Sequence, residues 1–409
     1  MTEENSSSTG PLEKVKVIEI TTTWAGPMAG CILADFGAEV IRVEHPDGDV
    51  TRRIGYRFPG TDESVNYHTV NRNKKSIALD LHDAQAQEIA RKLVATADVL
   101  IENFRKGALE RWGLGYDRCA ELNPRLVYAS ITGFGQNGPY SEQAAYDPVI
   151  QFMSGWASRN GTRSSGALRA PTALADDLGG VHAALGVLAA LRHRDVTGRG
   201  QYVDISMMDA MLFQSNTNLT IGALGIEQEK QENRYPTVPA SVYDCRDGQI
   251  YIAVLLEKQW TNLANLIDRQ LAADSRFSSA ALRVKYREEI DQRVNDWCTL
   301  QTRADVLALC HSVGIPAAQV ATFREVAQDP QVEARDMLQR VEIKPGVFGD
   351  LVGPAVKFSS TPTRIRSAAP GVGAHTEEVL ESIGYSKEDI SEFRMSGVIL
   401  PLSRRSDAD

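Results

Sequence analysis

The chain has 409 residues, two to three times the usual domain length of about 150 residues, which predicts more than one hydrophobic core. Its 43% hydrophobic and 24% charged residues are typical of a globular protein, and its net charge of -9 argues against nucleic acid as the general partner. The five cysteines are scattered, odd in number and form no C-x-x-C pair, which indicates a reducing cytoplasm and argues against a zinc site.

The first residues, "MTEENSSSTGPLE", are acidic and serine-rich, so we expect neither a signal peptide nor a membrane anchor there. No apolar run is expected to reach the roughly 20 residues that span a bilayer. Strand-like segments then alternate with helix-like ones. The strands are predicted at residues 14–21, 39–46, 76–81, 98–104 and 126–132, and the helices at 26–38, 84–97 and 108–113. This alternation predicts a largely parallel sheet covered by helices.

The pattern changes after a predicted helix at residues 207–224. Residues 226–241 are polar and contain prolines, which indicates a crossing into a second domain. A hairpin with its turn at Asp247-Gly248 and mostly helical sequence follow, and residues 375–399 predict two short helices. We therefore predict an α/β protein with a large Rossmann-like domain from residues 1–225 and 330–409, and a smaller α+β domain from residues 226–329.

Most standard catalytic motifs are missing. The loop "GFGQNG", residues 133–138, follows a predicted strand as a dinucleotide site requires, but Pro139 and Tyr140 come next in place of a helix start. A functional loop at the carboxyl end of a strand is the better interpretation. The sequence contains no G-x-S-x-G, Walker A or H-E-x-x-H motif, and its histidines are isolated, so metal catalysis is not predicted.

Two adjacent carboxylates, Asp176 and Asp177, precede an apolar helical pattern that starts at Leu178. An aspartate at a helix start is a natural N-cap, which explains one carboxylate better than two. A carboxylate in a tight, glycine-lined site also acts as a nucleophile toward an activated acyl group. Both interpretations stay open on spacing alone.

Several segments together resemble a known family, the class III (family III) CoA-transferases. They are "ADFGAEVIRVEHPDGDVTR", "NRNKKSIALDL", "DVLIENFRKGALERWGLGY", "ITGFGQNGPY", "AAYDPVIQFMSG", "ADDLGGVHAALGVLAAL", "TGRGQYVDISMMDAML" and "HTEEVLESIGYS". The family includes formyl-CoA:oxalate and carnitine CoA-transferases and, as an offshoot, α-methylacyl-CoA racemase. The resemblance covers nearly the whole chain in the family's order.

The resemblance implies an interlocked homodimer, each chain a ring made of the large and the small domain. It implies that Asp176 is the nucleophile and Asp177 a bystander or cap. The reaction passes CoA from an acyl-CoA donor to a carboxylic acid through an aspartyl anhydride and an aspartyl-CoA thioester. Acyl-CoA is then a substrate, and no tightly bound cofactor or metal is expected.

The resemblance also assigns residues to CoA or to the acyl pocket. These are Trp24, Arg42, His45, Arg52, Arg72, Lys74, Lys75, Asn103, Phe104, Ala108, Arg111 and Tyr146. A few converging Arg and Lys side chains would let an acidic protein hold a phosphate-rich ligand.

Departures from the family pattern narrow the expected reaction. Trp24 replaces the glutamine of the formyl-CoA enzyme, and "NRYPTVPAS" replaces its glycine-run loop, which argues against oxalate and formate as substrates. Tyr146 stands where racemases carry a histidine; a phenol is a poorer proton shuttle at neutral pH, so transfer is favoured over racemisation. The presence of Asp176 argues against a non-catalytic subunit of a heteromeric enzyme. We expect a small-dicarboxylate donor such as succinyl-CoA, with Arg163 or Arg169 as candidates for its distal carboxylate.

Overall fold

The computed structural model describes residues 10–162, 164–230 and 232–399, so the first nine residues and Arg163 lie outside it. The described chain forms two compact units. The first takes the described residues of Met1–Ala157, Arg169–Glu227 and Glu333–Asp409, and the second those of Ser158–Leu168 and Gln228–Val332. The division into a large domain of residues 1–225 and 330–409 and a small domain of residues 226–329 stays a prediction.

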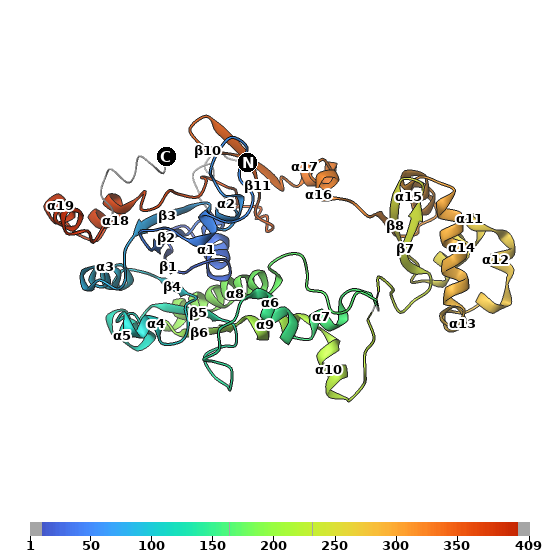
Figure 1. The fold of residues 1–409 in the computed structure, drawn as a ribbon, viewed down its shortest axis with the longest axis horizontal. Helices are drawn as coiled ribbons and strands as arrows, with labels where there is room; N and C mark the ends of the chain where they lie inside the picture. The colour runs from blue at the N-terminus through green and yellow to red at the C-terminus, as the bar shows by residue number, and fades with distance from the viewer. Residues whose placement is uncertain (1–9, 163, 231, 400–409) are drawn as a thin grey trace. The chain divides into compact units, whose positions relative to one another are not determined.

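A six-stranded, fully parallel sheet in the order β3-β2-β1-β4-β5-β6 forms the centre of the first unit (Figure 1). Its strands are β1 (Lys16–Ile20), β2 (Glu39–Glu44), β3 (Lys74–Ala78), β4 (Val99–Glu102), β5 (Val127–Thr132) and β6 (Tyr202–Ser206). The parallel sheet is confirmed, and β6 is a strand that the sequence analysis missed. The strand order reverses between β1 and β4, and the loops that leave two such strands diverge and open a crevice at their carboxyl ends.

Helices cover both faces of this sheet because successive strand residues point to opposite sides. In β1, Ile18 and Ile20 belong to one core and Val17 to the other. The helices packed in the first core are α3 (Ala84–Ala95), α5 (Tyr116–Leu122), α18 (Thr376–Ser382) and α19 (Lys387–Ser396). Those of the second are α1 (Ala25–Asp35), α6 (Asp147–Met153), α8 (Leu174–Thr197) and α9 (Met207–Gln214).

Helix α8 begins at Leu174, one turn before the start predicted from the apolar pattern. Asp176 and Asp177 therefore lie inside its first turn, and the interpretation of Asp177 as an N-cap was wrong. The N-cap position is Ala173, which makes no side-chain cap, and the carboxylate of Asp147 in α6 accepts the N–H of Ala175 instead, at 2.7 Å. A neighbouring helix thus satisfies the free N-terminal backbone of α8.

Close packing against α1 holds the first turns of α8 in place. A Cβ on Gly180 would come within 2.7 Å of the Met28 Cβ and 2.9 Å of the Ala25 carbonyl oxygen, so only glycine allows this approach.

By length and composition alone α8 could cross a membrane, which corrects the expectation that no apolar run approaches that length. Its buried residues pack inside the second core, so α8 is a core helix of the α/β unit.

The remaining elements of the first unit are short. They are α2 (Val65–Asn71), α4 (Ala108–Arg111), α10 (Thr217–Ala223), the 3₁₀ turn Val50–Arg52 and the antiparallel pair β10 (Leu338–Lys344) and β11 (Val347–Val352). The single helix predicted at residues 207–224 is divided into α9 and α10, because Asn216 adopts a left-handed φ of 53° between them. The hairpin β10–β11 was not predicted.

The second unit is an α+β structure with its own core. Its antiparallel sheet has the order β7-β8-β9, with β7 (Ala240–Cys245), β8 (Gly248–Ala253) and β9 (Ala317–Gln319). Its helices are α11 (Glu257–Ile267), α12 (Arg269–Ala273), α13 (Ala280–Lys285), α14 (Arg287–Thr299) and α15 (Arg303–Ser312), with a 3₁₀ turn at Ser275–Phe277. Three further short helices, α7 (Trp156–Arg159), α16 (Phe323–Val326) and α17 (Pro330–Ala334), lie in or near the connections between the units. The predicted hairpin is present, but Cys245 pairs with Gly248, so the turn is Arg246-Asp247, one residue earlier than expected.

Candidate active site

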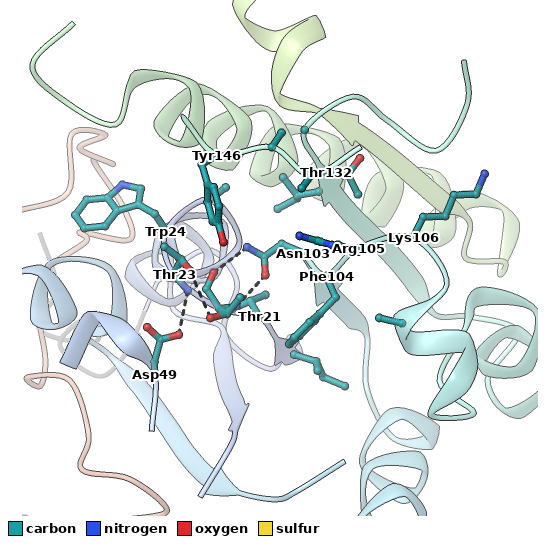
Figure 2. Close-up of a pocket in the computed structure, with 18 of the residues that line it drawn as sticks. Thr21, Thr23, Trp24, Asp49, Asn103, Phe104, Arg105, Lys106, Thr132 and Tyr146 are labelled. Atoms are coloured by element: carbon teal, nitrogen blue, oxygen red, sulfur yellow. Dashed lines mark hydrogen bonds between the residues drawn. The ribbon is translucent and has the colours of Figure 1, made fainter. Parts of the chain in front are cut away.

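A cavity of about 790 Å³ lies in the first unit where the parallel strands end. The loops that follow β1, β2, β3, β4 and β5 line it, together with the start of α8. This is the crevice that the reversal of strand order creates, and its volume falls in the range of small-molecule sites. Figure 2 shows Trp24 and Lys106 at opposite ends of the residues drawn.

The loop between β1 and α1 is held from both sides. The Thr22 N–H donates to Oδ1 of Asn103 at 2.8 Å, and the Asn103 amide donates back to the Thr22 carbonyl at 2.8 Å. The Thr23 N–H donates to Asp49 at 3.0 Å, and Thr23 has a left-handed φ of 67° (Figure 2). A threonine in this conformation is strained and persists only where its surroundings fix it. These bonds therefore determine where Trp24, the next residue, points.

Buried charges lie beneath this loop. Arg42 in β2 is 0% exposed and ion-paired with Glu19 at 2.6 Å and with Asp49 at 2.7 Å. Lys74 pairs with the other carboxylate oxygen of Glu19 at 2.7 Å. A buried cation is stable only when carboxylates compensate its lost hydration. The surroundings of Arg42 and Lys74 thus give both residues a structural place beneath the cavity, and they offer no support for direct contact with CoA.

Asp176 lines the cavity, and its carboxyl group is a weak acid there. Burial, together with the negative charges of Asp147 and Asp177, raises the pKa of Asp176 to about 7. Near neutral pH this carboxyl is therefore divided between its protonated and ionised forms, and the ionised form is more basic than an ordinary carboxylate. Such perturbed groups in a cleft are typical of functional sites.

Asp177 has different surroundings from its neighbour. It is not among the residues that line the cavity, and its Oδ1 accepts a hydrogen bond from the indole N–H of Trp24 at 2.7 Å. Burial raises the pKa of Asp177, and the Trp24 hydrogen bond and the charge of Asp147 act in opposite directions on it, the first lowering and the second raising it. Only one of the two adjacent carboxylates thus faces the space where a ligand would bind.

Most of the predicted site residues that do not belong to strands β2 or β3 line this cavity. Those that line it are Trp24, His45, Asn103, Phe104, Ala108, Arg111, Tyr146 and Asp176. Phe104 packs edge-on against Trp112, with ring centroids 5.1 Å apart, and Tyr146 is 69% exposed. The loop that carries Asn103 and Phe104 is anchored by the buried Glu102, which accepts the Phe104 N–H at 2.8 Å.

Three other predicted basic residues are not among the residues that line the cavity, and each is paired with one or two carboxylates. Arg72 pairs with Asp35 at 2.6 Å and Arg52 with Glu44 at 2.7 Å. Lys75 bridges Glu39 and Glu378, at 2.6 Å to each. Contact of these residues with CoA stays a prediction that their positions do not support. The guanidinium of Arg169 donates to the neighbouring Ala170 carbonyl, and this residue does not line the cavity.

The sequence analysis missed two basic residues of the cavity wall, Arg105 and Lys106. Both are exposed and follow Phe104 in the loop after β4. The Lys106 ammonium donates to the Gln136 carbonyl at 3.0 Å, which ties this loop to the glycine loop at residues 133–138. The available signal was their position in "ENFRK", directly after a strand that ends at the crevice. Among the described residues, no group of three or more His, Cys, Asp or Glu side chains could hold a metal ion.

The family model described as "CoA-transferase family III" matches residues 12–376. The succinyl-CoA–L-malate CoA-transferase beta subunit of Chloroflexus aurantiacus is 35% identical over 409 residues, which cover 97% of this chain and 100% of that protein. The chain belongs to CoA-transferase family III. The succinate–glutarate CoA-transferase of Agrobacterium fabrum is 36% identical over 384 residues, covering 91% of this family III enzyme and 96% of its relative.

The fold agrees with that assignment. The crystal structure of a CAIB/BAIF family protein from Brucella suis matches this family III CoA-transferase with a TM-score of 0.83 at 34% identity, covering 92% of this chain and 100% of that one. The resemblance and the α/β fold inferred from the sequence are confirmed. The protein is a class III CoA-transferase, an enzyme that uses CoA thioesters as substrates.

The raised pKa of Asp176 predicts a stability change with a defined pH dependence. The pKa of this carboxyl is about 7 in the folded enzyme and about 4 in an unfolded chain, so ionisation destabilises the fold. The destabilisation is complete above pH 7 and disappears as the pH falls toward 4. Asp176→Asn should therefore raise the free energy of unfolding by about 1–3 kcal/mol at pH 8 and by much less at pH 5.

Urea unfolding of both proteins at the two pH values measures this difference. Asp195→Asn, at an exposed carboxylate near the other end of α8, is the matched control and should have the same small effect at both pH values. An equal gain for Asp176→Asn at pH 5 and pH 8 would contradict the prediction.

Proposed function

We propose that this CoA-transferase moves CoA from an acyl-CoA donor to a carboxylic acid through covalent intermediates on Asp176. The observation that carries the proposal is the place of this carboxylate: it faces the cavity at the carboxyl ends of the sheet and has a raised pKa of about 7. A more basic carboxylate is a better nucleophile toward a thioester once it is ionised.

The reaction proceeds in four displacements at carbonyl carbons. Asp176 attacks the donor thioester, which forms an aspartyl anhydride and releases CoA thiolate. The thiolate attacks the aspartyl carbonyl, which forms aspartyl-CoA and releases the donor acid. The acceptor carboxylate then attacks aspartyl-CoA, and the thiolate released in this step attacks the acceptor acyl group of the second anhydride. One thioester replaces another, so no ATP is needed.

We propose that the CoA chain extends from the basic loop after β4 toward Asp176. Arg105, Lys106 and Arg111 line the cavity and would pair with phosphate groups. Phe104 and Ala108 add apolar surface to this wall. Trp24 and Tyr146, which Figure 2 shows on the side of the cavity away from Lys106, would contact the acyl group. No step requires a tightly bound cofactor.

Succinyl-CoA is the proposed donor, and a second small di- or hydroxycarboxylic acid the proposed acceptor. Two relatives carry succinyl-CoA or succinate in their names, with L-malate and glutarate as the partner acids. A human relative that is 33% identical is named succinyl-CoA:glutarate CoA-transferase. Two alternatives are retained: a 2-methylacyl-CoA racemase, and a subunit of a heteromeric enzyme, the second because the Chloroflexus relative is named a beta subunit.

Incubation of the purified protein with succinyl-CoA and a panel of malate, glutarate, citramalate and oxalate, followed by mass spectrometry, tests the transfer. We expect a new acyl-CoA with at least one small acid other than oxalate. A parallel incubation with (R)-2-methylacyl-CoA in deuterated water, without an acceptor acid, should give no α-deuterium. Deuterium incorporation without transfer would establish the racemase alternative, and activity only with a second protein would establish the heteromeric one.

Trapping tests the covalent route. With succinyl-CoA present, hydroxylamine should convert the activated carboxyl to a hydroxamate and inactivate the enzyme, and peptide mapping should locate the adduct on Asp176. Asp176→Ala should abolish transfer and retain CoA binding, because it removes the nucleophile and leaves the basic residues of the cavity wall in place. Full transfer by Asp176→Ala would disprove the mechanism.

We further propose that the chain forms an interlocked homodimer in the cytoplasm. Apolar side chains on α8, on α9 and directly after α10 are unusually exposed in one chain: Val181, Leu185, Phe213 and Leu224 are 49%, 63%, 75% and 71% exposed. Exposed apolar groups of this kind mark protein contacts. Light scattering should give twice the chain mass for the wild type and a smaller mass for Leu185→Asp. A monomeric wild type would contradict the dimer, and cell fractionation checks the location.

A further inference from the structure

The enzyme must select one of two adjacent carboxylates. Successive residues of an α-helix point about 100° apart, so the first turn of α8 directs Asp176 and Asp177 to different surroundings. Asp176 lines the cavity, and Asp177 accepts the indole N–H of Trp24 at 2.7 Å. A hydrogen bond from a neutral donor to a carboxylate is worth most when the carboxylate is ionised. The contact with Trp24 therefore favours a charged Asp177 held beside the nucleophile.

Trp24 reaches Asp177 from a loop whose conformation is fixed. The loop is tied to Asn103 on one side and to Asp49 on the other, and Asp49 is in turn paired with the buried Arg42. The strained backbone of Thr23 directs the following residue toward α8. The backbone that carries Trp24 is thus held by Asn103 and Asp49, and its indole N–H reaches Asp177.

Few charged groups act on Asp176. Asp147 from α6 and Asp177 from α8 are the charges that raise its pKa, in addition to burial. The cavity lining also includes Ile131 in β5 and Met207 at the start of α9. The ring Nδ1 of His182 in α8 contacts the Leu178 carbonyl, at 2.8 Å, within the same helix. A change at Asp177 therefore alters one of the two carboxylates, among the described residues, whose charges raise the pKa of Asp176.

We propose that Trp24 and Asp177 form a positioning pair for Asp176. The indole N–H holds the Asp177 carboxylate away from the cavity, so that acyl groups are transferred to Asp176 alone, and the retained negative charge makes Asp176 a more basic nucleophile. This inference rests on the proposed function, because it presupposes an acyl intermediate on Asp176. In this role Trp24 and Asp177 act through Asp176 and take no acyl group themselves, and the side chain of Trp24 also lines the cavity.

Three substitutions distinguish the effect of the hydrogen bond from the effect of the charge on Asp177. Trp24→Phe keeps an aromatic ring and removes the N–H donor. Asp177→Asn keeps an oxygen acceptor for the indole and removes the charge, and Asp177→Ala removes both. Trp156→Phe is the matched control, because its indole N–H also makes one hydrogen bond in the same unit, to the Met211 carbonyl at 3.1 Å, and Trp156 does not line the cavity.

The experiment measures kcat, KM for succinyl-CoA, the pH profile of kcat/KM and the site of hydroxylamine trapping. Trp24→Phe should lower kcat by about tenfold, change KM by less than about threefold and give hydroxamate on Asp177 as well as on Asp176. Asp177→Asn should move the acid limb of the pH profile to lower pH, because the loss of a like charge eases ionisation of Asp176. Trp156→Phe should keep the wild-type pH profile and the adduct on Asp176 alone.

A double-mutant cycle tests whether Trp24 acts through Asp177. In the Asp177→Ala background, Trp24→Phe should cause little further loss of kcat. The proposal would be overturned if Trp24→Phe lowered kcat equally in the wild-type and the Asp177→Ala backgrounds. It would also be overturned if Trp24→Phe kept the wild-type kcat and the wild-type site of labelling. If Trp24→Phe fails to fold, the pH profile of Asp177→Asn decides: an unchanged acid limb overturns the proposal.

The wild-type labelling separates this inference from the proposed function. If the wild type gives no adduct on either aspartate, the covalent function fails and the pair fails with it. If the wild type and Trp24→Phe are both labelled on Asp176 alone with the same kcat, only the positioning pair fails.

Discussion

The pairing of buried cations with buried carboxylates beneath the β1–α1 loop is the constraint on which the site depends. Arg42 and Lys74 lie inside the sheet, and both need Glu19 to compensate the loss of water. The second carboxylate of Arg42, Asp49, also accepts the Thr23 N–H. The need to compensate the buried charge of Arg42 thus also fixes the loop at the surface of the crevice. Trp24 follows this loop and donates its indole N–H to Asp177 in the first turn of α8.

The basic residues near the sheet form two groups, which differ in whether they line the cavity. Those in β2, in β3 and beside them face carboxylates of neighbouring elements, as Arg72 faces Asp35. Those in the loop after β4 and in α4 line the cavity, where we propose that a phosphate-rich ligand binds, and among them Lys106 also lies 3.6 Å from the Glu142 carboxylate. An acidic protein with a net charge of -9 can in this way present positive charge locally, because most of its other cations near the sheet are already neutralised.

Asp176, the proposed nucleophile, lies in surroundings that disfavour its ionised form. Burial and two neighbouring carboxylates raise the pKa of Asp176 to about 7, so its ionised form is more basic than an ordinary carboxylate and also destabilises the folded enzyme. Close packing of Gly180 against Met28 and the backbone of α1 keeps α8 in place despite that repulsion. Function and stability thus make different demands on the same turn of helix.

The sequence by itself determined the parallel sheet and the family, because alternating apolar periods and the order of motifs are local properties of the chain. It also drew attention to Asp176 and Asp177, but only the structure shows that Asp176 lines the cavity and Asp177 does not. It did not determine the start of α8, since Ala173 carries no capping signal and the cap for Ala175 comes from Asp147, 28 residues away. It also assigned Arg42 and Lys74 to the ligand, although Glu19 holds both. Only the tertiary structure decided which charges are buried and which face the cavity, because burial depends on the contacts that distant segments make once the sheet is assembled.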